Sequence, residues 1–281
     1  MSAKENVNLW DVDIPTDLLN QSEQEYLSSQ PTNLPTVEWV WVEMDRVWDK
    51  YGLNNKKPLD GQPIAEFYSH PVWLMNGVFT SLDPVSSKHR DVISQFITEN
   101  DFELIADYAG GFGELAIKIA EKSPNATVQI IEPYPSKFGL FRLKDKHNIE
   151  VIDSLGNNKY DAVIAQDVLE HVEDPIGLAI TLTESVKDNG VILFANCFYP
   201  VIKCHLPKTF HLRHTFRFVM AAYGLKYQGR LVGAEHVLIF KKIRRVNAKN
   251  ARLAERISQA VGGVINWGRD ILSSLKNLVT S

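Results

Sequence analysis

The sequence predicts an α/β protein with a doubly wound, mostly parallel sheet. Apolar strands alternate with helical segments over residues 103–243, which is the order expected of a parallel sheet with helices on both faces. Several of these strands are apolar throughout instead of alternating, as buried parallel strands are. A glycine-rich turn at 110–113 separates the first strand from its helix. A helical N-terminal extension and a helical C-terminal tail are expected to flank this domain.

The elements follow from apolar periodicity, turn residues and caps, taken in chain order. Strands are expected at 103–109, 126–134, 149–155, 160–168, 190–198 and 235–243. Helices are expected at 37–53, 86–100, 113–123, 138–148, 176–190 and 215–225. Asp174 and Pro175 suit the N-cap and first position of the helix that follows them. Residues 1–35 are polar and turn-rich, so an irregular surface segment is expected there, and 56–63 is expected to be a loop.

Composition excludes several classes. The chain has 281 residues, is 44% hydrophobic and 23% charged, and carries a net charge of −4, which is ordinary for a globular protein and argues against a nucleic-acid binder. No apolar run is long enough to span a bilayer, and the N-terminus lacks the pattern of a signal peptide. Cys197 and Cys204 match no zinc or redox spacing, so the cytoplasm is the expected location.

The glycine turn raises the question of its ligand. Gly111 and Gly113, followed by Ala116, fit the pattern of a dinucleotide-binding turn. However, Asp107 just before the turn and Glu114 at the helix start would repel a pyrophosphate and suit a ligand with positive charge. A dinucleotide-dependent oxidoreductase is therefore the weaker alternative. A non-catalytic nucleotide-binding scaffold is a third, since fold alone does not establish activity.

Four stretches occur in an order that points to a family. They are DYAGGFGE at 107–114, YDAVIAQDVLEHVEDP at 160–175, DNGVILFANCF at 188–198 and HLRHTFRFVMAAYGL at 211–225. Over residues 65–240 the chain resembles the class I, Rossmann-like methyltransferases that use S-adenosylmethionine. Its fourth motif is similar to that of ubiquinone-pathway and related small-molecule or sugar O-methyltransferases. The resemblance implies S-adenosylmethionine as cofactor and a hydroxyl oxygen as the favoured methyl acceptor.

The resemblance also implies a cofactor site at the strand ends. Glu132 would hold the ribose hydroxyls, and Asp153 would meet the adenine amino group. The implied cofactor-binding residues are Asp107, Ala109, Gly110, Gly111, Gly113, Glu132, Pro133, Asp153, Ser154, Gln166, Asp167 and Val168.

Histidines are the catalytic candidates, because histidine is the natural general base near neutral pH. His171 follows the fourth strand, and His214 lies before a late helix. A structural role is the alternative for both. Asp167, Glu170 and His171 also share one face of a helical turn, and some relatives with this pattern hold a divalent metal there while many use none. A fourth ligand could come from His205, His211 or His214.

The acceptor is expected to be a small molecule or a sugar, not a nucleic acid. Tyr68, His70 and Trp73 lie in an aromatic run before the cofactor motif, where relatives place a helix that closes over the ligands. Arg213 could meet an anionic group of the acceptor. Packing or solvation are the alternatives for these side chains.

The chain is expected to divide into an N-terminal extension or lid (1–80), the methyltransferase domain (81–245) and a basic amphipathic tail (246–281). Residues 241–256 hold seven basic residues and one acid. The apolar positions that follow keep helical spacing, and a break is expected at Gly268. Such a tail could lie on an anionic membrane, pack against a second subunit, or dock on its own domain.

Overall fold

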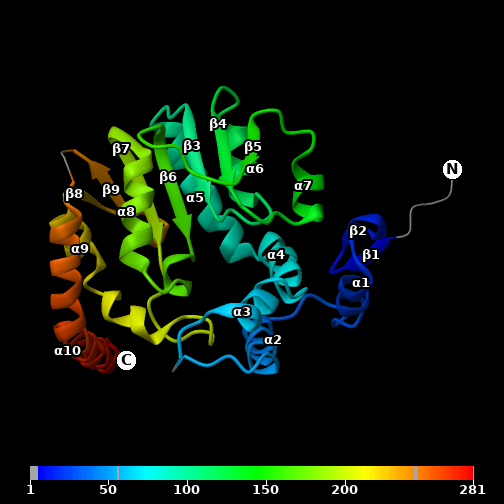
Figure 1. Cartoon of the computed structure of the whole chain (residues 1–281), viewed down its shortest axis with the longest axis horizontal. Helices are drawn as coiled ribbons and strands as arrows, with labels where there is room; N and C mark the ends of the chain where they lie inside the picture. The colour runs from blue at the N-terminus through cyan, green and yellow to red at the C-terminus, as the bar shows by residue number, and fades with distance from the viewer. Residues whose placement is uncertain (1–5, 56, 244–245, 281) are drawn as a thin grey trace. The chain divides into compact units, whose positions relative to one another are not determined.

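The computed structural model describes residues 6–55, 57–243 and 246–280, with side chains up to residue 272 in the last segment. The chain divides into two compact units, Met1–Leu155 and Gly156–Ser281. The described strands form a two-stranded sheet, β1-β2, and a seven-stranded sheet in the order β5-β4-β3-β6-β7-β9-β8 (Figure 1). The predicted doubly wound, mostly parallel α/β fold is confirmed.

The first unit begins with a hairpin and a group of helices and continues into three strands. Its elements are β1 (Asn6–Leu9), β2 (Val12–Pro15), the 3-10 turn η1 (Thr16–Leu18), α1 (Gln21–Ser28), α2 (Val37–Lys50), α3 (Gly61–Tyr68), α4 (Val72–Leu82), α5 (Pro84–Glu99), β3 (Leu104–Tyr108), α6 (Glu114–Lys122), β4 (Thr127–Ile131), α7 (Lys137–Leu143) and β5 (Ile149–Ile152).

Strands β3, β4 and β5 are parallel and in register. Tyr108 pairs with Ile131, and Ile131 pairs with Ile152, so the three strands end at one edge of the sheet. The central residues Ile105 and Ala106 of β3 and Val128 and Ile130 of β4 are fully buried, as expected for strands covered on both faces. Strand β5 lies at the edge of the sheet, and its residues are partly or fully exposed. Parallel register therefore places whatever follows each strand at a common edge.

The prediction that residues 1–35 form an irregular segment is wrong for the part that the structure describes. Strands β1 and β2 pair as an antiparallel hairpin. Its turn residues, Trp10 and Asp11, have φ of 52° and 66°, the backbone geometry of a type I′ turn. Trp10 is buried, and its Nε1 donates to the Pro31 carbonyl at 2.9 Å. The hairpin is held by this buried indole instead of the usual Asn-Gly. The loop expected at 56–63 is also too long, because α3 begins at Gly61.

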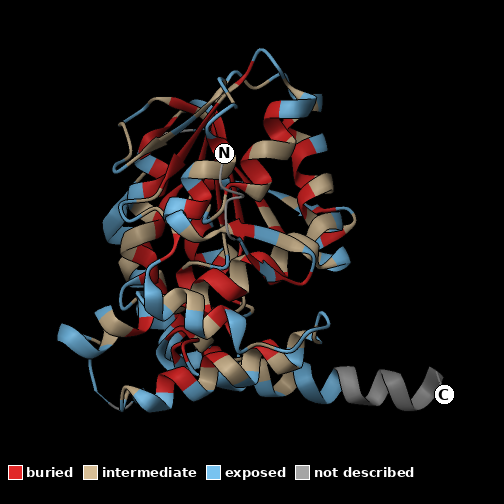
Figure 2. Ribbon diagram, turned by 90° about the vertical axis from the view of Figure 1, so that its right-hand side faces the viewer, coloured by how far each residue is buried: buried red, intermediate tan, exposed pale blue. Residues whose placement is uncertain are grey.

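The second unit contains the remaining strands and the C-terminal helix. Its elements are β6 (Tyr160–Gln166), η2 (Leu169–His171), α8 (Pro175–Ser185), β7 (Val186–Ala195), η3 (Pro207–Leu212), α9 (Phe216–Tyr223), β8 (Leu225–Leu231), β9 (Ala234–Lys242) and α10 (Ala248–Thr280). Strands β6 and β7 are parallel, whereas β9 runs antiparallel to both of its neighbours, β7 and β8. Figure 2 shows the central strands as mostly buried and the C-terminal helix α10 as carrying many exposed residues.

Three expectations for this unit are corrected. The helix expected at 176–190 ends at Ser185, because Val186 pairs with Tyr160 and starts β7. Strand β8 was not expected, since its polar sequence leaves only its two end residues buried. The break expected at Gly268 is absent: α10 runs through it, and a Cβ there would meet nothing within 4 Å.

No helix in the described ranges combines the length and the apolar character that crossing a membrane requires.

Candidate active site

The turn after β3 is shaped by its glycines. Gly111 and Gly113 have φ of 55° and 76°, and Ala109 also has a positive φ of 55°. A Cβ on Gly110 would lie 2.5 Å from Oδ2 of Asp107, whereas a Cβ on Gly111 would meet nothing within 4 Å. Glycine is therefore required at position 110, because a Cβ would collide with Asp107. At position 113 it is required by the positive φ, and also because a Cβ there would lie 2.8 Å from the side chain of Leu143. The side of Gly111 is open to a ligand.

A buried carboxylate lies beside this turn. Asp107 is only 3% exposed, and its Oδ2 has no hydrogen-bond partner among the described residues. Burial raises the pKa of Asp107 to about 7, Arg90 opposes this rise, and Glu132 adds to it. An orphaned carboxylate oxygen is costly in a protein interior. It suits a ligand that brings an N–H donor or a positive charge.

Two more carboxylates follow the neighbouring strands. Glu132 comes directly after β4, and its backbone N–H donates to the Ile152 carbonyl at 2.9 Å. Its half-buried carboxylate has a raised pKa, mainly because of burial. Asp153 comes directly after β5 and is exposed, with the hydroxyl of Ser154 donating to its Oδ1 at 3.1 Å. Within the first unit, Asp107, Glu132 and Asp153 thus lie at one sheet edge, as the sequence predicted. Pro133 is exposed after Glu132.

Glu114 was expected to present a free negative charge at the start of α6, and it does not. Its carboxylate forms an ion pair with Arg142, in which both side chains are mostly covered. The electrostatic argument against a pyrophosphate therefore rests on Asp107 alone.

Helix α4 reaches the glycine turn. A Cβ on Gly77 would lie 2.7 Å from the ring of Phe112, the residue between Gly111 and Gly113. Neither Gly77 nor Phe112 was predicted for the site. An aromatic residue inside a glycine turn is the signal that could have indicated a covering helix.

The predicted acceptor-binding aromatic residues pack together in the first unit. The rings of Tyr68 and Trp73 are stacked at 5.2 Å, and Tyr68 is partly exposed. His70 contacts Tyr26 and Tyr51 edge to face, and its Nδ1 accepts the Val72 N–H at 3.1 Å. Burial is the main cause that lowers the pKa of His70 to about 4. These contacts give His70 a packing role, whereas Tyr68 remains 42% exposed.

In the second unit, a strained turn follows β6. Asp167 is exposed and has a positive φ of 53°, and its N–H donates to the Ala195 carbonyl at 2.8 Å. Gln166 and Val168 flank it and are partly exposed. A positive φ is uncommon outside glycine, and Asp tolerates it better than most residues. The turn leads directly into η2.

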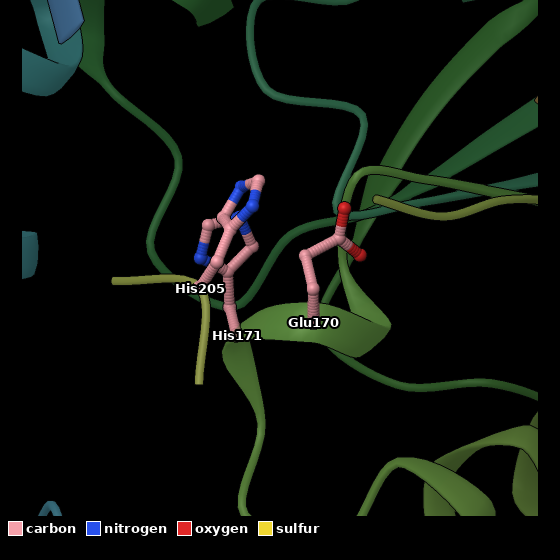
Figure 3. A group of neighbouring side chains, drawn as sticks. All are labelled: Glu170, His171 and His205. Carbon is pink, nitrogen blue, oxygen red and sulfur yellow. The ribbon is translucent and has the colours of Figure 1, made fainter. Parts of the chain in front are cut away.

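Glu170, His171 and His205 form a compact cluster (Figure 3). Each offers a ligand atom, and these atoms lie within 4.8 Å of one another. Glu170 and His171 come from η2, and His205 comes from the segment before η3, with its ring 4.8 Å from that of His171. The predicted metal group of Asp167, Glu170 and His171 is thus changed: His205 joins the cluster and Asp167 does not.

Glu170 is the buried acid of this cluster. It is fully buried, and its Oε1 accepts the Cys197 N–H at 2.7 Å. Its Oε2 has no hydrogen-bond partner within the described part of the chain. Burial raises the pKa of Glu170 to about 8, and Asp167 contributes. A cation in the cluster would hold Glu170 ionised.

Both histidines are oriented by backbone carbonyls. Nδ1 of His171 lies 3.1 Å from the Cys204 carbonyl, and Nδ1 of His205 lies 3.1 Å from the Tyr199 carbonyl. A carbonyl only accepts, so each Nδ1 carries a hydrogen, and in the neutral form of each ring Nε2 then carries the lone pair. Burial, followed by His205, lowers the pKa of His171 to about 3. Two imidazoles held in this way, with one carboxylate, are suitable ligands for a divalent metal.

The other predicted histidines lie apart from this cluster. Nδ1 of His211 is 2.7 Å from the Ser258 hydroxyl, in a contact with α10. His214 has a buried Nε2 with no hydrogen-bond partner among the described residues, and burial lowers its pKa. Arg213 pairs with Asp270 at 3.2 Å and lies over the ring of Tyr199. The structure therefore groups Arg213 and Tyr199, a residue that was not predicted.

Asn196 was also not predicted. It directly follows β7, and both polar atoms of its side chain are buried without a hydrogen-bond partner among the described residues. A polar residue that ends an otherwise apolar strand is the signal that could have indicated it. Its amide is available to a ligand at the carboxyl end of β7.

Comparison with known families decides the class. A methyltransferase domain family matches residues 87–228, half of the chain. The chain belongs to the class I methyltransferases that use S-adenosylmethionine. The oxidoreductase and scaffold alternatives receive no support from the comparisons.

Individual relatives agree with this family. The ubiquinone biosynthesis O-methyltransferase of Rickettsia prowazekii is 29% identical over 154 residues, which cover 50% of this chain and 59% of the relative. The chain therefore spans less than two thirds of that relative's length.

Solved structures show the same fold. An O-methyltransferase family protein from Burkholderia thailandensis is 13% identical with a TM-score of 0.52, over 86% of this chain and 80% of that one. Human N-acetylserotonin methyltransferase in complex with S-adenosylmethionine is 15% identical with a TM-score of 0.52, over 79% of this chain and 70% of that one.

The first unit's residues fit the cofactor of this methyltransferase family. S-adenosylmethionine carries an ammonium group, a sulfonium and a ribose diol. The orphaned Oδ2 of Asp107 suits a cationic donor. The open side of Gly111 allows close approach, and the two oxygens of Glu132 suit a diol.

Proposed function

We propose that this protein transfers a methyl group from S-adenosylmethionine to a hydroxyl oxygen of a small molecule or sugar. The observation that carries the proposal is the orphaned carboxylate of Asp107 beside a turn whose glycines are required by contact and conformation. The curated O-methyltransferase relative supports oxygen as the acceptor atom. We assign residues 81–245 to the methyltransferase domain, residues 1–80 to an extension or lid, and the protein to the cytoplasm.

The first unit's residues hold the cofactor in this proposal. Asp107 meets the positive end of the methionine portion, and the backbone of Ala109 to Gly113 lies against it. Glu132 accepts the ribose hydroxyls and Asp153 meets the adenine. Methyl transfer from a sulfonium needs little covalent help, so the main task of these residues is to hold the methyl group in line with its acceptor.

The second unit's cluster acts on the acceptor. His171 is a weak base at neutral pH, because its pKa of about 3 disfavours proton uptake. Glu170, His171 and His205 fit a divalent cation instead, and a bound cation would lower the pKa of a coordinated acceptor hydroxyl. The buried Oε2 of Glu170 favours this role over a general-base histidine.

A thermal-shift experiment tests the cofactor. S-adenosylhomocysteine should stabilise the protein, because a ligand that binds only the folded state raises its stability, and NAD should not. Stabilisation by NAD alone would contradict the proposal.

Glu132→Ala tests the assigned diol contact. Charge-assisted hydrogen bonds contribute about 1.5–3 kcal/mol, so affinity for S-adenosylhomocysteine should fall at least about tenfold. Calorimetry gives the affinity, and Glu150→Ala, which removes a carboxylate from β5 itself, is the control. Unchanged affinity in Glu132→Ala would remove this residue from the site.

A further inference from the structure

Helix α10 docks on its own unit through small and polar residues. Ala251, Ser258 and Gly262 are buried. The Ser258 hydroxyl lies 2.5 Å from that of Thr215. A Cβ on Gly262 would be 2.6 Å from the carbonyl oxygen of His211. The inner face of this helix therefore contains no large apolar side chain at these three positions.

The opposite face carries the large apolar residues. They recur at intervals of three or four, which places them on one side of the helix. They are Leu253, Ile257, Val261, Val264, Trp267 and Ile271, and all are exposed. Val264 is 71% exposed and Trp267 is 67% exposed. A surface helix normally buries its apolar stripe, so this helix has the reverse arrangement.

Cations border this apolar stripe. Lys249, Arg252 and Arg256 line a shallow hollow at the start of the helix, together with Ala248 and Leu253.

The acids of the helix are directed elsewhere. Between residues 248 and 272 they are Glu255 and Asp270. Glu255 is buried and pairs with Arg252, and Asp270 pairs with Arg213. Over the described side chains of α10, the outward side is therefore apolar and basic.

Two occupants could cover such a face: a second copy of the chain or a lipid surface. The seam of a two-helix coiled coil is a narrow stripe. Here the apolar stripe is wider, because the exposed residues Val261 and Trp267 are about 120° apart around the helix at 100° per residue. The same face of a second copy would bring more cations to Lys249 and Arg256, and the two acids of its helix between 248 and 272 are already paired with Arg252 and Arg213. An anionic surface complements both the width and the charge.

We propose that α10 binds an anionic lipid bilayer, lying in its plane with the apolar stripe at the boundary of headgroups and acyl chains. Lys249 and Arg256 at its start contact the headgroups, whereas Arg252 stays paired with Asp174 and Glu255. The inner face stays docked through Ser258 and Gly262, so the helix carries the second unit to the membrane. This surface is separate from the residues assigned to methyl transfer.

Vesicle flotation of the full-length protein tests the proposal. The protein should float with vesicles of phosphatidylcholine and phosphatidylserine and bind much less to phosphatidylcholine alone. The double substitution Val264→Asp with Trp267→Asp should abolish flotation, because it places two charges in the stripe. Val232→Asp is the matched control, since Val232 is 87% exposed in the turn between β8 and β9; it should float like the wild type.

A second variant isolates the charges. Each basic residue near an anionic surface contributes about 1 kcal/mol, or roughly fivefold in binding. Lys249→Gln with Arg256→Gln should therefore weaken binding about 25-fold and reduce its dependence on salt. Thermal unfolding with S-adenosylhomocysteine checks that each variant is folded.

Three outcomes would overturn the proposal. The first is no flotation of the wild-type protein with anionic vesicles. The second is equal flotation of wild type and the Val264→Asp, Trp267→Asp variant. The third is a lipid-free dimer, seen by light scattering, that this variant converts to a monomer, which would assign the face to a second copy.

Discussion

The turn after β3 and the turn after β6 both bring functional residues to the carboxyl end of a strand, but they do so in different ways. Both leave a strand at its carboxyl end with positive φ, at Gly111 in one and at Asp167 in the other. The first turn is made by glycines close in sequence. The second leads into a cluster whose third member, His205, is 34 positions beyond His171. The first site is set by local backbone conformation, whereas the second depends on the tertiary fold.

The two regions also bury charge differently. Asp107 has an orphaned oxygen with a positive charge, Arg90, in its electrostatic environment. Glu170 has an orphaned oxygen, two imidazoles beside it, and another acid, Asp167, in its electrostatic environment. The first arrangement suits an organic cation, and the second suits a metal ion, which would be the strongest local charge.

The largest expected effect is in the cluster. His171→Ala should lower turnover about 10²–10⁴-fold while leaving affinity for S-adenosylhomocysteine nearly unchanged, since loss of a ligand to the proposed cation would remove a stabilisation of the acceptor oxygen worth several kcal/mol. Turnover and calorimetry are measured in parallel. His214→Ala is the matched control, because His214 lies outside the cluster.

Chelation separates the two roles of His171. Activity lost with a chelator and restored by zinc or magnesium would support the metal site. Wild-type activity in both His171→Ala and His205→Ala would show that the cluster is structural and would remove the contrast between the two turns.

The next largest effect is expected from substitutions that disrupt the glycine turn after β3. Gly110→Ala places a Cβ 2.5 Å from Oδ2 of Asp107, and overpacking of this kind costs about 1–3 kcal/mol of folding stability. Because the Asp107 carboxylate must move to relieve this contact, cofactor affinity should also fall. A Cβ at position 111 would meet no other atom within 4 Å, so Gly111→Ala adds only the strain of a positive φ. The loss of cofactor affinity should therefore be smaller in Gly111→Ala than in Gly110→Ala. Calorimetry with S-adenosylhomocysteine compares them. Equal losses would show that Asp107 does not set this turn.

This contrast explains what the sequence could predict. Strands β3 to β6, the glycine turn and the positions of the carboxylates Asp107, Glu132 and Asp153 after or at the ends of their strands were placed correctly, because each follows from local pattern and parallel register. His205 could be named only as one of three candidates, since its place depends on the backbone of residues 197–205. The hairpin at Trp10 was missed because tertiary burial, not turn chemistry, holds it.

A smaller effect concerns pH. Burial raises the pKa of Asp107 to about 7, so its ionisation costs folding stability increasingly as pH rises from about 4 to about 7. A cationic ligand favours the ionised form, so cofactor affinity should rise about tenfold between pH 6 and pH 8 and then level off. Asp107→Asn should remove this rise. A rise of equal size in the Asn variant would assign it to another group, such as Glu132.

The smallest expected effect concerns the stability of α10, which has two glycines adjacent in sequence. It tests whether tertiary contact or helix propensity determines the effect of replacing each of them. Gly263 has nothing within 4 Å of a Cβ, so Gly263→Ala should stabilise the protein by up to about 1 kcal/mol through helix propensity. Gly262→Ala gains the same propensity, but its Cβ would lie 2.6 Å from the backbone oxygen of His211. Because backbone cannot move aside cheaply, Gly262→Ala should destabilise the docked helix despite that gain. Chemical denaturation and hydrogen exchange of the α10 amides measure the pair. Equal stabilisation by both substitutions would mean that α10 does not pack on His211, and propensity alone would then govern this helix.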